Sequence, residues 1–349
     1  MAMIQQAALK IADPAPVAAT AAPFVDVRNL EVRIDTPDAK VPLLNGVSFS
    51  LRAGEVLCLL GESGSGKSMT VRSLMRLLPE GARISGKVEV GGVDVLALKE
   101  RQLRTIRGPL ISMIFQEPAT AFDPTFTIGY QIAETVRLHE GVSRAAARKR
   151  ALDLLELVQV PSAARRLDAY PHELSGGLRQ RAMIALALSC RPKLLIADEP
   201  TTALDATVQI QVLLLLRELQ SELGMATIFV THDIGVACEI ADRIAVMYAG
   251  RFVEEGPIDR IIAAPQHPYT IGLLHSVVTA EAAGTRLESI PGAPPSPAQL
   301  PAGCSFNPRC FAAVPACAQQ LPDLREAADD HFVRCIRAPL APEERGLRK

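Results

Sequence analysis

A glycine-rich segment that ends in a lysine and a serine is the clearest chemical feature of the sequence. It reads Gly61-Glu62-Ser63-Gly64-Ser65-Gly66-Lys67-Ser68, which fits the pattern G-x-x-x-x-G-K-S/T. Glycines in such a loop let backbone N–H groups turn toward phosphate oxygens, and a helix that begins there adds partial positive charge. Lys67 can then reach the β- and γ-phosphates of a nucleotide, and Ser68 offers a hydroxyl ligand to Mg²⁺. The segment predicts a phosphate cradle.

Two adjacent carboxylates, Asp198 and Glu199, follow the apolar run 194–197. Ligand sites in parallel sheets form at the carboxyl ends of strands, so both side chains are candidates for one site. Asp198 suits the Mg²⁺ shell, and Glu199 can orient or deprotonate the water that attacks the γ-phosphate. His232 ends another apolar run and could contact the γ-phosphate, although a lone histidine there more often has a structural role.

The elements that must position these residues follow from the hydrophobic pattern. Short β-like runs before Glu55 predict an antiparallel layer, and apolar residues at helical spacing predict a helical subdomain between about 99 and 188. Strand, helix and strand then alternate, which predicts an α/β fold with parallel pairing. The expected elements are strands Val25–Val27, Val47–Leu51 and Val56–Leu60, helix Met69–Leu78, strands Leu194–Ala197 and Thr227–Val230 around helix Val208–Glu222, and the hairpin Ile244–Tyr248 with Arg251–Glu254.

Composition limits the class of protein. Of 349 residues, 48% are hydrophobic and 21% charged, which is ordinary for a packed domain and too apolar for a disordered one. The net charge of −1 provides no basic field, so we expect no nucleic-acid partner. No run reaches the roughly 18–20 apolar residues of a membrane span. Residues 1–23 are rich in Ala and Pro and interrupted by Lys10 and Asp13, so we read them as a disordered leader of a cytoplasmic protein.

The segment Leu174-Ser175-Gly176-Gly177-Leu178-Arg179-Gln180-Arg181 closely resembles the LSGGQ signature of ABC ATPases, and a helix is expected over Arg181–Ser189. The resemblance covers roughly 24–256 and includes a Q-loop glutamine at Gln116, a D-loop at Ala203-Leu204-Asp205 and a switch histidine at His232. It implies a P-loop NTPase core of the ABC ATPase type, with an antiparallel β layer, the inserted helical subdomain and a C-terminal appendage.

The resemblance also implies how ATP is held. Ser175 and the amides of Gly176 and Gly177 would bind the γ-phosphate of ATP carried by the opposite subunit, so that ATP joins two subunits and hydrolysis releases them. Gln116 would link sensing of the γ-phosphate to a membrane partner. The implied site comprises Gly61, Glu62, Ser63, Gly64, Ser65, Gly66, Lys67, Ser68, Gln116, Ser175, Gly176, Gly177 and Asp205 for ATP; Ser68, Gln116 and Asp198 for Mg²⁺; and Lys67, Glu199 and His232 for catalysis.

The sequence departs from the family where adenine is recognised. Family members usually stack adenine on an aromatic residue upstream of the phosphate loop, but no Phe, Tyr or Trp occurs from Glu31 to Gly46. We expect Ile34 or Val41 to pack there, with a relaxed preference among nucleoside triphosphates.

The C-terminal part, 257–349, resembles the ATPases of oligopeptide/dipeptide importers. The matching features are Gln266-His267-Pro268-Tyr269-Thr270, Leu273-Leu274, Ile290-Pro291-Gly292 and the cysteine segment that begins at Gly303-Cys304. The resemblance implies a second ABC ATPase subunit, two transmembrane permease subunits and an extracytoplasmic solute-binding protein as partners. The chain would lie peripherally on the cytoplasmic face of the inner (plasma) membrane. Import of nickel, glutathione or another small solute, and a soluble ABC ATPase of DNA repair or translation, are the alternatives.

Four of the seven cysteines cluster near the end of the chain. Cys304, Cys310, Cys317 and Cys335 follow the spacing C-x5-C-x6-C-x17-C. Cytosolic chains rarely use such clusters for disulfides, so metal ligation is the stronger interpretation. Some importers of this type carry a four-iron, four-sulfur (4Fe–4S) cluster, while zinc and no metal are the alternatives. Cys58, Cys190 and Cys238 stand singly in apolar segments and are expected to be inert core thiols.

Overall fold

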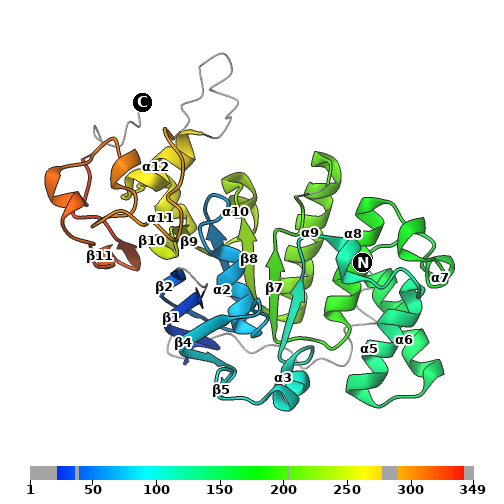
Figure 1. The fold of residues 1–349 in the computed structure, drawn as a ribbon. Coiled ribbons are helices and arrows are strands. Elements are labelled where there is room, and N and C mark those ends of the chain that lie inside the picture. Colours follow the sequence, from blue (N-terminus) through cyan, green and yellow to red (C-terminus); the bar gives the residue numbers. More distant parts are fainter. Residues whose placement is uncertain (1–21, 36–38, 203, 277–289, 342–349) are drawn as a thin grey trace. The chain divides into compact units, whose positions relative to one another are not determined.

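The computed structural model describes residues 22–35, 39–202, 204–276 and 290–341 (Figure 1). The chain divides into two compact units. The first is built mainly from Glu89–Phe229, and the second from Asp26–Ser50, Val56–Val88 and the chain from Val230 onward. The leader expected over 1–23 lies outside the described residues, except for Ala22 and Pro23.

Helices dominate the first unit. Three of them, α5, α6 and α8, pack on one another (Figure 1). Each begins at a hydroxyl residue, Thr127, Ser143 or Ser175, whose side chain accepts a hydrogen bond from a first-turn N–H. The helical elements described in this unit are α3 (Glu100–Ile106), α4 (Pro118–Ala121), α5 (Ile128–Glu140), α6 (Arg144–Leu157), α7 (Ala163–Arg166), the 3-10 turn η1 (Pro171–Glu173), α8 (Gly176–Leu188) and α9 (Ala206–Leu223).

The strands β6 (Ile111–Ile114), β7 (Leu194–Asp198) and β8 (Ala226–Thr231) lie in the order β8-β7-β6. Every residue of these strands is buried, as expected when both faces of a sheet are covered. β6 and β7 are parallel, with Ile114 opposite Ala197. The residues that follow these two positions therefore leave the sheet at the same edge. β6 also interrupts the region predicted as helical between 99 and 188.

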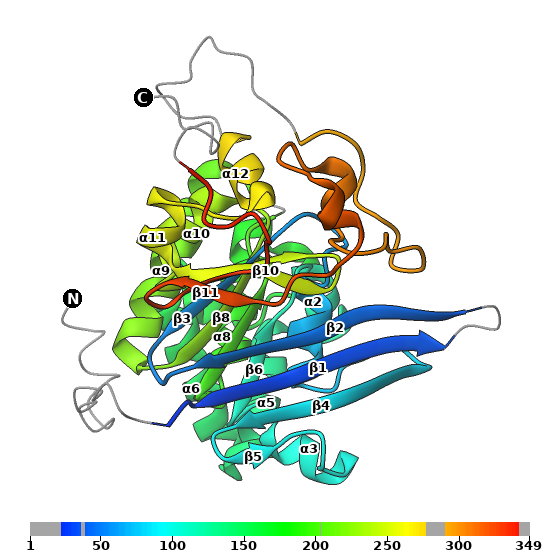
Figure 2. The ribbon, with the colours of Figure 1, turned by 90° about the vertical axis from the view of Figure 1, so that its left-hand side faces the viewer.

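The predicted antiparallel layer corresponds to β1 (Val25–Asp35), β2 (Lys40–Leu51) and β4 (Ala82–Val90), which lie side by side in Figure 2. The short strand β5 (Val93–Asp94) pairs antiparallel with the end of β4. β1 is longer than the predicted Val25–Val27. The alternation of buried and exposed residues is interrupted at Asn29, where φ is 47°, and the strand continues beyond this interruption. There Leu30 and Val32 are again fully buried, so the apolar face continues.

The second unit also contains strands in the order β11-β12-β10-β9-β3. β3 runs parallel to β9, and β9 and β10 form the predicted antiparallel hairpin. The remaining elements described here are β3 (Val56–Leu60), α2 (Lys67–Leu74), α10 (Ile234–Ile240), β9 (Arg243–Tyr248), β10 (Arg251–Pro257), α11 (Ile258–Ala263), α12 (Pro268–His275), the 3-10 turns η3 (Asn307–Arg309) and η4 (Pro315–Ala318), β11 (Arg325–Ala328) and β12 (His331–Val333).

Two predicted helices have different bounds in the structure. α2 ends at Leu74, four residues before the predicted end, because Arg76 takes a left-handed φ of 51° and Pro79 follows. α8 begins at Gly176 rather than Arg181, because Ser175 already caps it. Both errors come from local backbone chemistry that outweighs the apolar pattern.

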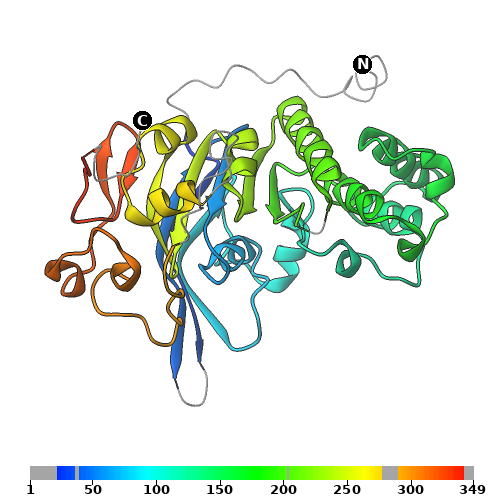
Figure 3. The same cartoon turned by 90° about the horizontal axis from the view of Figure 1, so that it is seen from above.

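The C-terminal segment joins the sheet of the second unit. β12 pairs antiparallel with β10, with Glu254 opposite Val333. Figure 3 shows the orange and red segment beside the yellow helices α11 and α12. Phe306 from this segment packs against Tyr248 and Tyr269, with ring centroids 5.2 and 5.3 Å away. The segment expected as a separate appendage therefore shares strands and core with the unit that carries the phosphate loop.

Two further observations concern exposure. Cys58 is buried as expected, but Cys238 is exposed, so its interpretation as a core thiol was wrong. Within the described ranges, none of the helices combines the length and apolarity that a membrane crossing requires.

Candidate nucleotide-binding site

The phosphate loop connects β3 with α2, and two of its glycines are required by their surroundings or backbone conformation. A Cβ on Gly61 would lie 2.3 Å from the carbonyl oxygen of Met247 on β9, so no side chain fits there. Gly66 is the N-cap of α2 with φ 111°, a left-handed conformation that favours glycine. The loop therefore lies close against β9 and turns directly into a helix N-terminus.

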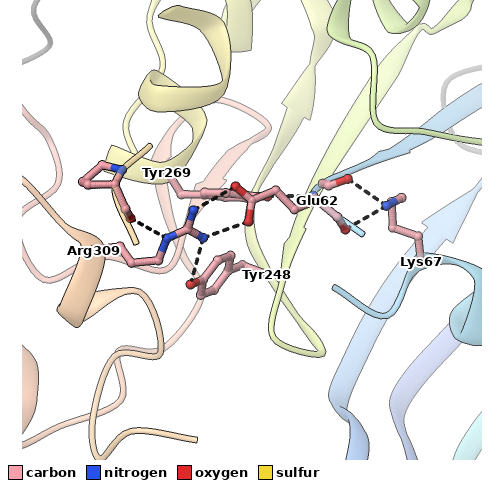
Figure 4. A network of polar contacts seen from close by, with 7 residues as sticks. Glu62, Lys67, Tyr248, Tyr269 and Arg309 are labelled. Carbon is pink, nitrogen blue, oxygen red and sulfur yellow. Dashed lines mark hydrogen bonds and ion pairs between the residues drawn. The ribbon is translucent and has the colours of Figure 1, made fainter. Parts of the chain in front are cut away.

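Polar atoms of the loop are buried and directed inward. Lys67 is 4% exposed, and its Nζ donates to the carbonyl oxygens of Gly61 at 2.7 Å and Glu62 at 3.0 Å (Figure 4). Ser65 is also buried, and its Oγ has no hydrogen-bond partner among the described residues. An unsatisfied buried hydroxyl at a helix N-terminus, beside an ammonium group, fits a phosphate ligand.

At the carboxyl edge of β6 and β7 the structure brings two predicted residues together. Gln116 and Glu199 each stand two positions beyond the paired residues Ile114 and Ala197. Gln116 Nε2 donates to Glu199 Oε2 at 3.1 Å, and Thr202 Oγ1 donates to the same oxygen at 3.0 Å. The parallel register thus explains how residues 83 positions apart come to share a hydrogen bond.

The neighbouring carboxylate, Asp198, is the last residue of β7 and is fully buried. Glu199 has φ 47°, an uncommon conformation for a residue with a side chain. Asp198 is thus fully buried while Glu199 is partly exposed, which suits separate roles for two adjacent carboxylates.

The signature segment forms the N-terminus of α8. Ser175 Oγ accepts the N–H of Leu178 at 3.4 Å, and both Ser175 and Gly176 are exposed. Gly177 lies so close to α9 that an added Cβ would be 2.8 Å from a methyl group of Val208. Because the start of this 13-residue helix is exposed, it can bind an anion that another molecule holds.

Two other predicted residues lie at helix starts. Asp205 caps α9, since its Oδ1 accepts the N–H of Val208 at 3.0 Å. His232 lies between β8 and α10 and is exposed, while the adjacent Asp233 caps α10. Asp205 therefore has a structural task in this chain in addition to the predicted contact with nucleotide.

The predicted residues fall into two groups. Gln116, Asp198, Glu199, Asp205 and the signature belong to the first unit. The phosphate loop and His232 belong to the second. Within the groups, the structure joins Gln116 to Glu199 and Lys67 to Gly61 and Glu62.

Comparison with known proteins gives this arrangement a family. The family described as ABC transporter matches residues 44–202, and the family described as oligopeptide/dipeptide transporter, C-terminal region, matches residues 253–317. A putative peptide import ATP-binding protein of Brucella melitensis biotype 1 is 48% identical over 331 residues, which cover 90% of this chain and 97% of the relative. The chain belongs to the ABC transporter ATP-binding proteins. It is an ATPase of the ABC class, and ATP with Mg²⁺ are the ligands that this class implies.

Other relatives agree with this membership. The oligopeptide transport ATP-binding protein OppD of Salmonella typhimurium is 49% identical over 294 residues, which cover 84% of this chain and 88% of OppD. Among solved structures, a dimeric ATP-binding cassette in a post-hydrolysis state bound to ADP and Pi has 29% identity and a TM-score of 0.61. That match covers 67% of this chain and 98% of the solved one. The ABC ATPase fold predicted from the sequence is confirmed.

A cavity in the second unit lies beside the segment 31–46, in which the sequence lacks an aromatic residue. Its lining comes from β1, β2 and β4 together with one arginine of β10 and contains no aromatic residue. Ile34 and Val41, the predicted packing residues, are not part of this lining, which instead includes Val32, Leu44 and Ile84. The expectation that Ile34 or Val41 packs against adenine stays a prediction.

The four clustered cysteines line a single pocket. Cys304, Cys310, Cys317 and Cys335 all border it, although they span 304–335 in the sequence. Burial raises the pKa of Cys310 to about 12 and also raises the pKa of Cys304 and Cys335. No group of three or more His, Cys, Asp or Glu residues within the described part of the chain is placed to hold a single metal ion.

Two residues that contact the phosphate loop were missed in the sequence. Tyr269 Oη accepts the N–H of Glu62 at 2.8 Å, and Arg309 donates to the Glu62 carboxylate at 2.8 and 3.1 Å (Figure 4). Tyr269 belongs to the His-Pro-Tyr run that marks the importer subfamily, and Arg309 directly precedes Cys310. Both segments carry the resemblance to the importer ATPases, but nothing in their spacing indicates contact with residue 62.

Proposed function

We propose that this chain hydrolyses ATP to power the import of di- and oligopeptides across the cytoplasmic membrane. The hydrogen bond from Gln116 to Glu199, at the edge of two parallel strands beside the buried Asp198, carries the catalytic part. The match of residues 253–317 to the oligopeptide/dipeptide C-terminal region supports peptides as cargo. Relatives at 48–49% identity are named for peptide import and oligopeptide transport.

In the proposed reaction the phosphate loop binds ATP first. Amides at the start of α2 receive phosphate oxygens, and Lys67 moves its ammonium group from the carbonyl oxygens of Gly61 and Glu62 to the β- and γ-phosphates. Ser65 Oγ, buried in the loop, gains the partner that the described residues do not offer. Binding therefore replaces contacts within the loop by contacts with phosphate.

The first unit would supply the groups around the attacking water. Glu199 orients or deprotonates that water, and His232 from the second unit contacts the γ-phosphate. Gln116 Nε2 donates to Glu199, so its amide oxygen Oε1 is the atom that could ligate a metal. Bound Mg²⁺ would neutralise phosphate charge, and the residues proposed to hold it are Ser68, Gln116 and Asp198.

A second ABC ATPase, identical or homologous, is the proposed partner in nucleotide binding. Ser175 and Gly176 are exposed at the start of α8 and would bind the γ-phosphate held by the other subunit. Two permease subunits and an extracytoplasmic solute-binding protein complete the proposed importer, with this chain on the cytoplasmic membrane face. We propose residues 24–256 as its ATPase domain, with the helical subdomain at about 99–188, and 257–349 as its importer-type extension.

For the four-cysteine pocket we propose a 4Fe–4S cluster. Each iron of such a cluster takes one thiolate, and the four thiols that border one pocket match that number. Burial keeps the pKa of three of these thiols high, so iron would supply the positive charge that holds them as thiolates. Together the four side chains would tie residues 304–335 around one centre.

The function is tested by purifying the tagged chain from gently solubilised native membranes and identifying its partners by mass spectrometry. Recovery of two multi-span permeases and a second ABC ATPase is expected, and peptide binding by the associated solute-binding protein would establish the cargo. A binding protein specific for nickel or glutathione would replace the cargo assignment. Recovery of ribosomal or DNA-repair proteins without any permease would overturn the transport function.

A further inference from the structure

Glu62, the second residue of the phosphate loop, is held through every polar group it has. Its N–H donates to Tyr269 Oη at 2.8 Å, and its carboxylate accepts two hydrogen bonds from Arg309. Its carbonyl oxygen accepts the N–H of Ser65 at 3.2 Å and Nζ of Lys67 at 3.0 Å (Figure 4). The backbone and side chain of this loop residue are thus determined by α12 and by the cysteine-containing tail.

Arg309 is itself fixed by several contacts. Its side chain is 6% exposed, Nε donates to the carbonyl oxygen of Pro291 at 2.9 Å, and Nη1 donates to Tyr248 Oη at 3.3 Å. The guanidinium also lies 5.8 Å from the Tyr248 ring centroid and 5.9 Å from that of Phe306. A buried arginine that holds a carboxylate with two parallel N–H groups is among the strongest and most directional contacts available.

Arg309 lies on a turn that is flanked by two of the four clustered cysteines. Arg309 ends the 3-10 turn η3, and Cys310 is the next residue. At the other end of this turn, the Asn307 N–H donates to the carbonyl oxygen of Cys304 at 2.9 Å. Two of the cysteines that line the pocket therefore flank the turn that carries the guanidinium.

We infer that Arg309 is a positioning residue for ATP binding: from the four-cysteine tail it holds Glu62, and through it the phosphate loop, in the conformation that receives ATP. The inference deepens the proposed function and rests on it only in so far as residues 61–68 bind ATP. Without Arg309, the Glu62 carboxylate loses its paired donors, and the carbonyl groups that orient Lys67 are no longer fixed. ATP must then order the loop as it binds, which weakens affinity and leaves the bound complex the same.

The test compares ATP binding and hydrolysis by the wild-type full-length chain, three single variants, one double variant and a control variant. Arg309→Met is expected to raise KM and Kd for ATP by roughly 10- to 50-fold with kcat within about threefold, where tenfold corresponds to about 1.4 kcal/mol. Arg309→Lys keeps the charge but not the paired geometry, so it should recover part of the affinity. Glu62→Gln should match Arg309→Met, and the double variant should lose little more.

Arg334→Met is the matched control. Arg334 is part-buried in the same tail, but its hydrogen bonds go to the carbonyl oxygens of Phe252 and Pro322 rather than to the loop. The KM of Arg334→Met for ATP should stay within about twofold of the wild-type value. Equal behaviour of Arg309→Met and Arg334→Met, or a fall in kcat without a rise in KM, would overturn the inference.

Two outcomes distinguish misfolding of a variant, or failure of the proposed ATP site, from failure of the inference about Arg309. If Arg309→Met lowers the melting temperature so far that it cannot be assayed, Glu62→Gln decides, because it leaves the tail sequence intact. An unchanged Kd in Glu62→Gln then overturns the inference. Failure of the wild-type chain to bind ATP would instead refute the phosphate-loop assignment itself.

Discussion

At the scale of single residues, Glu199 is positioned by backbone strain as well as by hydrogen bonds. A residue with a side chain at φ 47° costs of order 1–3 kcal/mol and persists only where its surroundings require it. Here the buried strand β7 ends one residue earlier, and Gln116 and Thr202 both donate to Glu199 Oε2. The carboxylate is therefore held in one direction before any substrate arrives, which is the arrangement expected of a group that positions water.

Replacement of this carboxylate should separate binding from hydrolysis. Glu199→Gln keeps the size of the side chain but removes the base and its charge, so we expect ATP turnover to fall roughly 100-fold or more. The Kd for ATP should change less than about threefold, because phosphate binding lies elsewhere. Phosphate release and equilibrium binding measure the two quantities.

Glu156→Gln, on the exposed surface of α6, is the control for this experiment. It should hydrolyse ATP at the wild-type rate. Wild-type turnover in Glu199→Gln would show that Glu199 is not the carboxylate on which hydrolysis depends.

At the scale of elements, the parts of the site that follow strands were predictable, and those that depend on the tail were not. A continuous apolar run that ends in polar residues predicts a buried strand whose carboxyl end can carry a site. This pattern correctly placed Asp198, Glu199 and the phosphate loop at the ends of β7 and β3. The pairing of β12 with β10 joins residues about 80 positions apart, and its short strands carry no periodic signal. The contact of Arg309 with Glu62 depends on that pairing and on aromatic packing, so it could not be read locally.

The start of α12 shows how burial couples a helix cap to pH. His267 is buried, and its ring Nδ1 accepts the backbone N–H of Tyr269 at 3.1 Å. The backbone N–H of His267 donates to the Glu254 carboxylate at 2.9 Å. Burial, with a smaller effect of Arg334, lowers the pKa of His267 from 6.5 to about 3. Below pH 6.5 the unfolded chain therefore binds a proton that the folded chain does not, and stability is lost as pH falls toward 3.

We expect this histidine to cost the wild-type chain about 2 kcal/mol of stability between pH 7 and pH 5. His267→Asn keeps a side chain that can cap α12 but removes the titration, so its stability should depend less on pH over the same range. Chemical denaturation of both chains at the two pH values measures the difference. Identical pH dependence in the two chains would show that His267 is not the group responsible.

At the scale of the whole chain, the second unit places the phosphate loop, the hairpin β9–β10 and the cysteine tail in one compact body. β12 extends the strand order from β10, and Phe306 packs against both Tyr248 and Tyr269. The tail is therefore part of the structure that supports nucleotide binding, and its integrity affects the stability of the unit as a whole.

The 4Fe–4S cluster proposed for the cysteine pocket is tested by its iron content and by the effect of its loss on stability. Protein purified without oxygen should be brown and contain iron and sulfide near four each per chain, as a 4Fe–4S cluster requires. Oxidative loss of the cluster should lower the melting temperature, because the four thiols then no longer tie the tail together. Iron analysis and thermal unfolding before and after loss measure both effects, with a chain carrying Cys238→Ser as the control for damage to an unrelated exposed thiol. Colourless, iron-free protein from anaerobic preparation would refute the cluster.

The contact between Glu62 and the tail also has a thermodynamic consequence in the reverse direction. Coupling between two sites is reciprocal, so a tail that strengthens nucleotide binding is itself strengthened by bound nucleotide to the same degree. A chain loaded with ATP would then open its cysteine pocket less often, and any metal there would exchange more slowly. The energy state of the cell would in this way influence how long a metal bound in that pocket is retained.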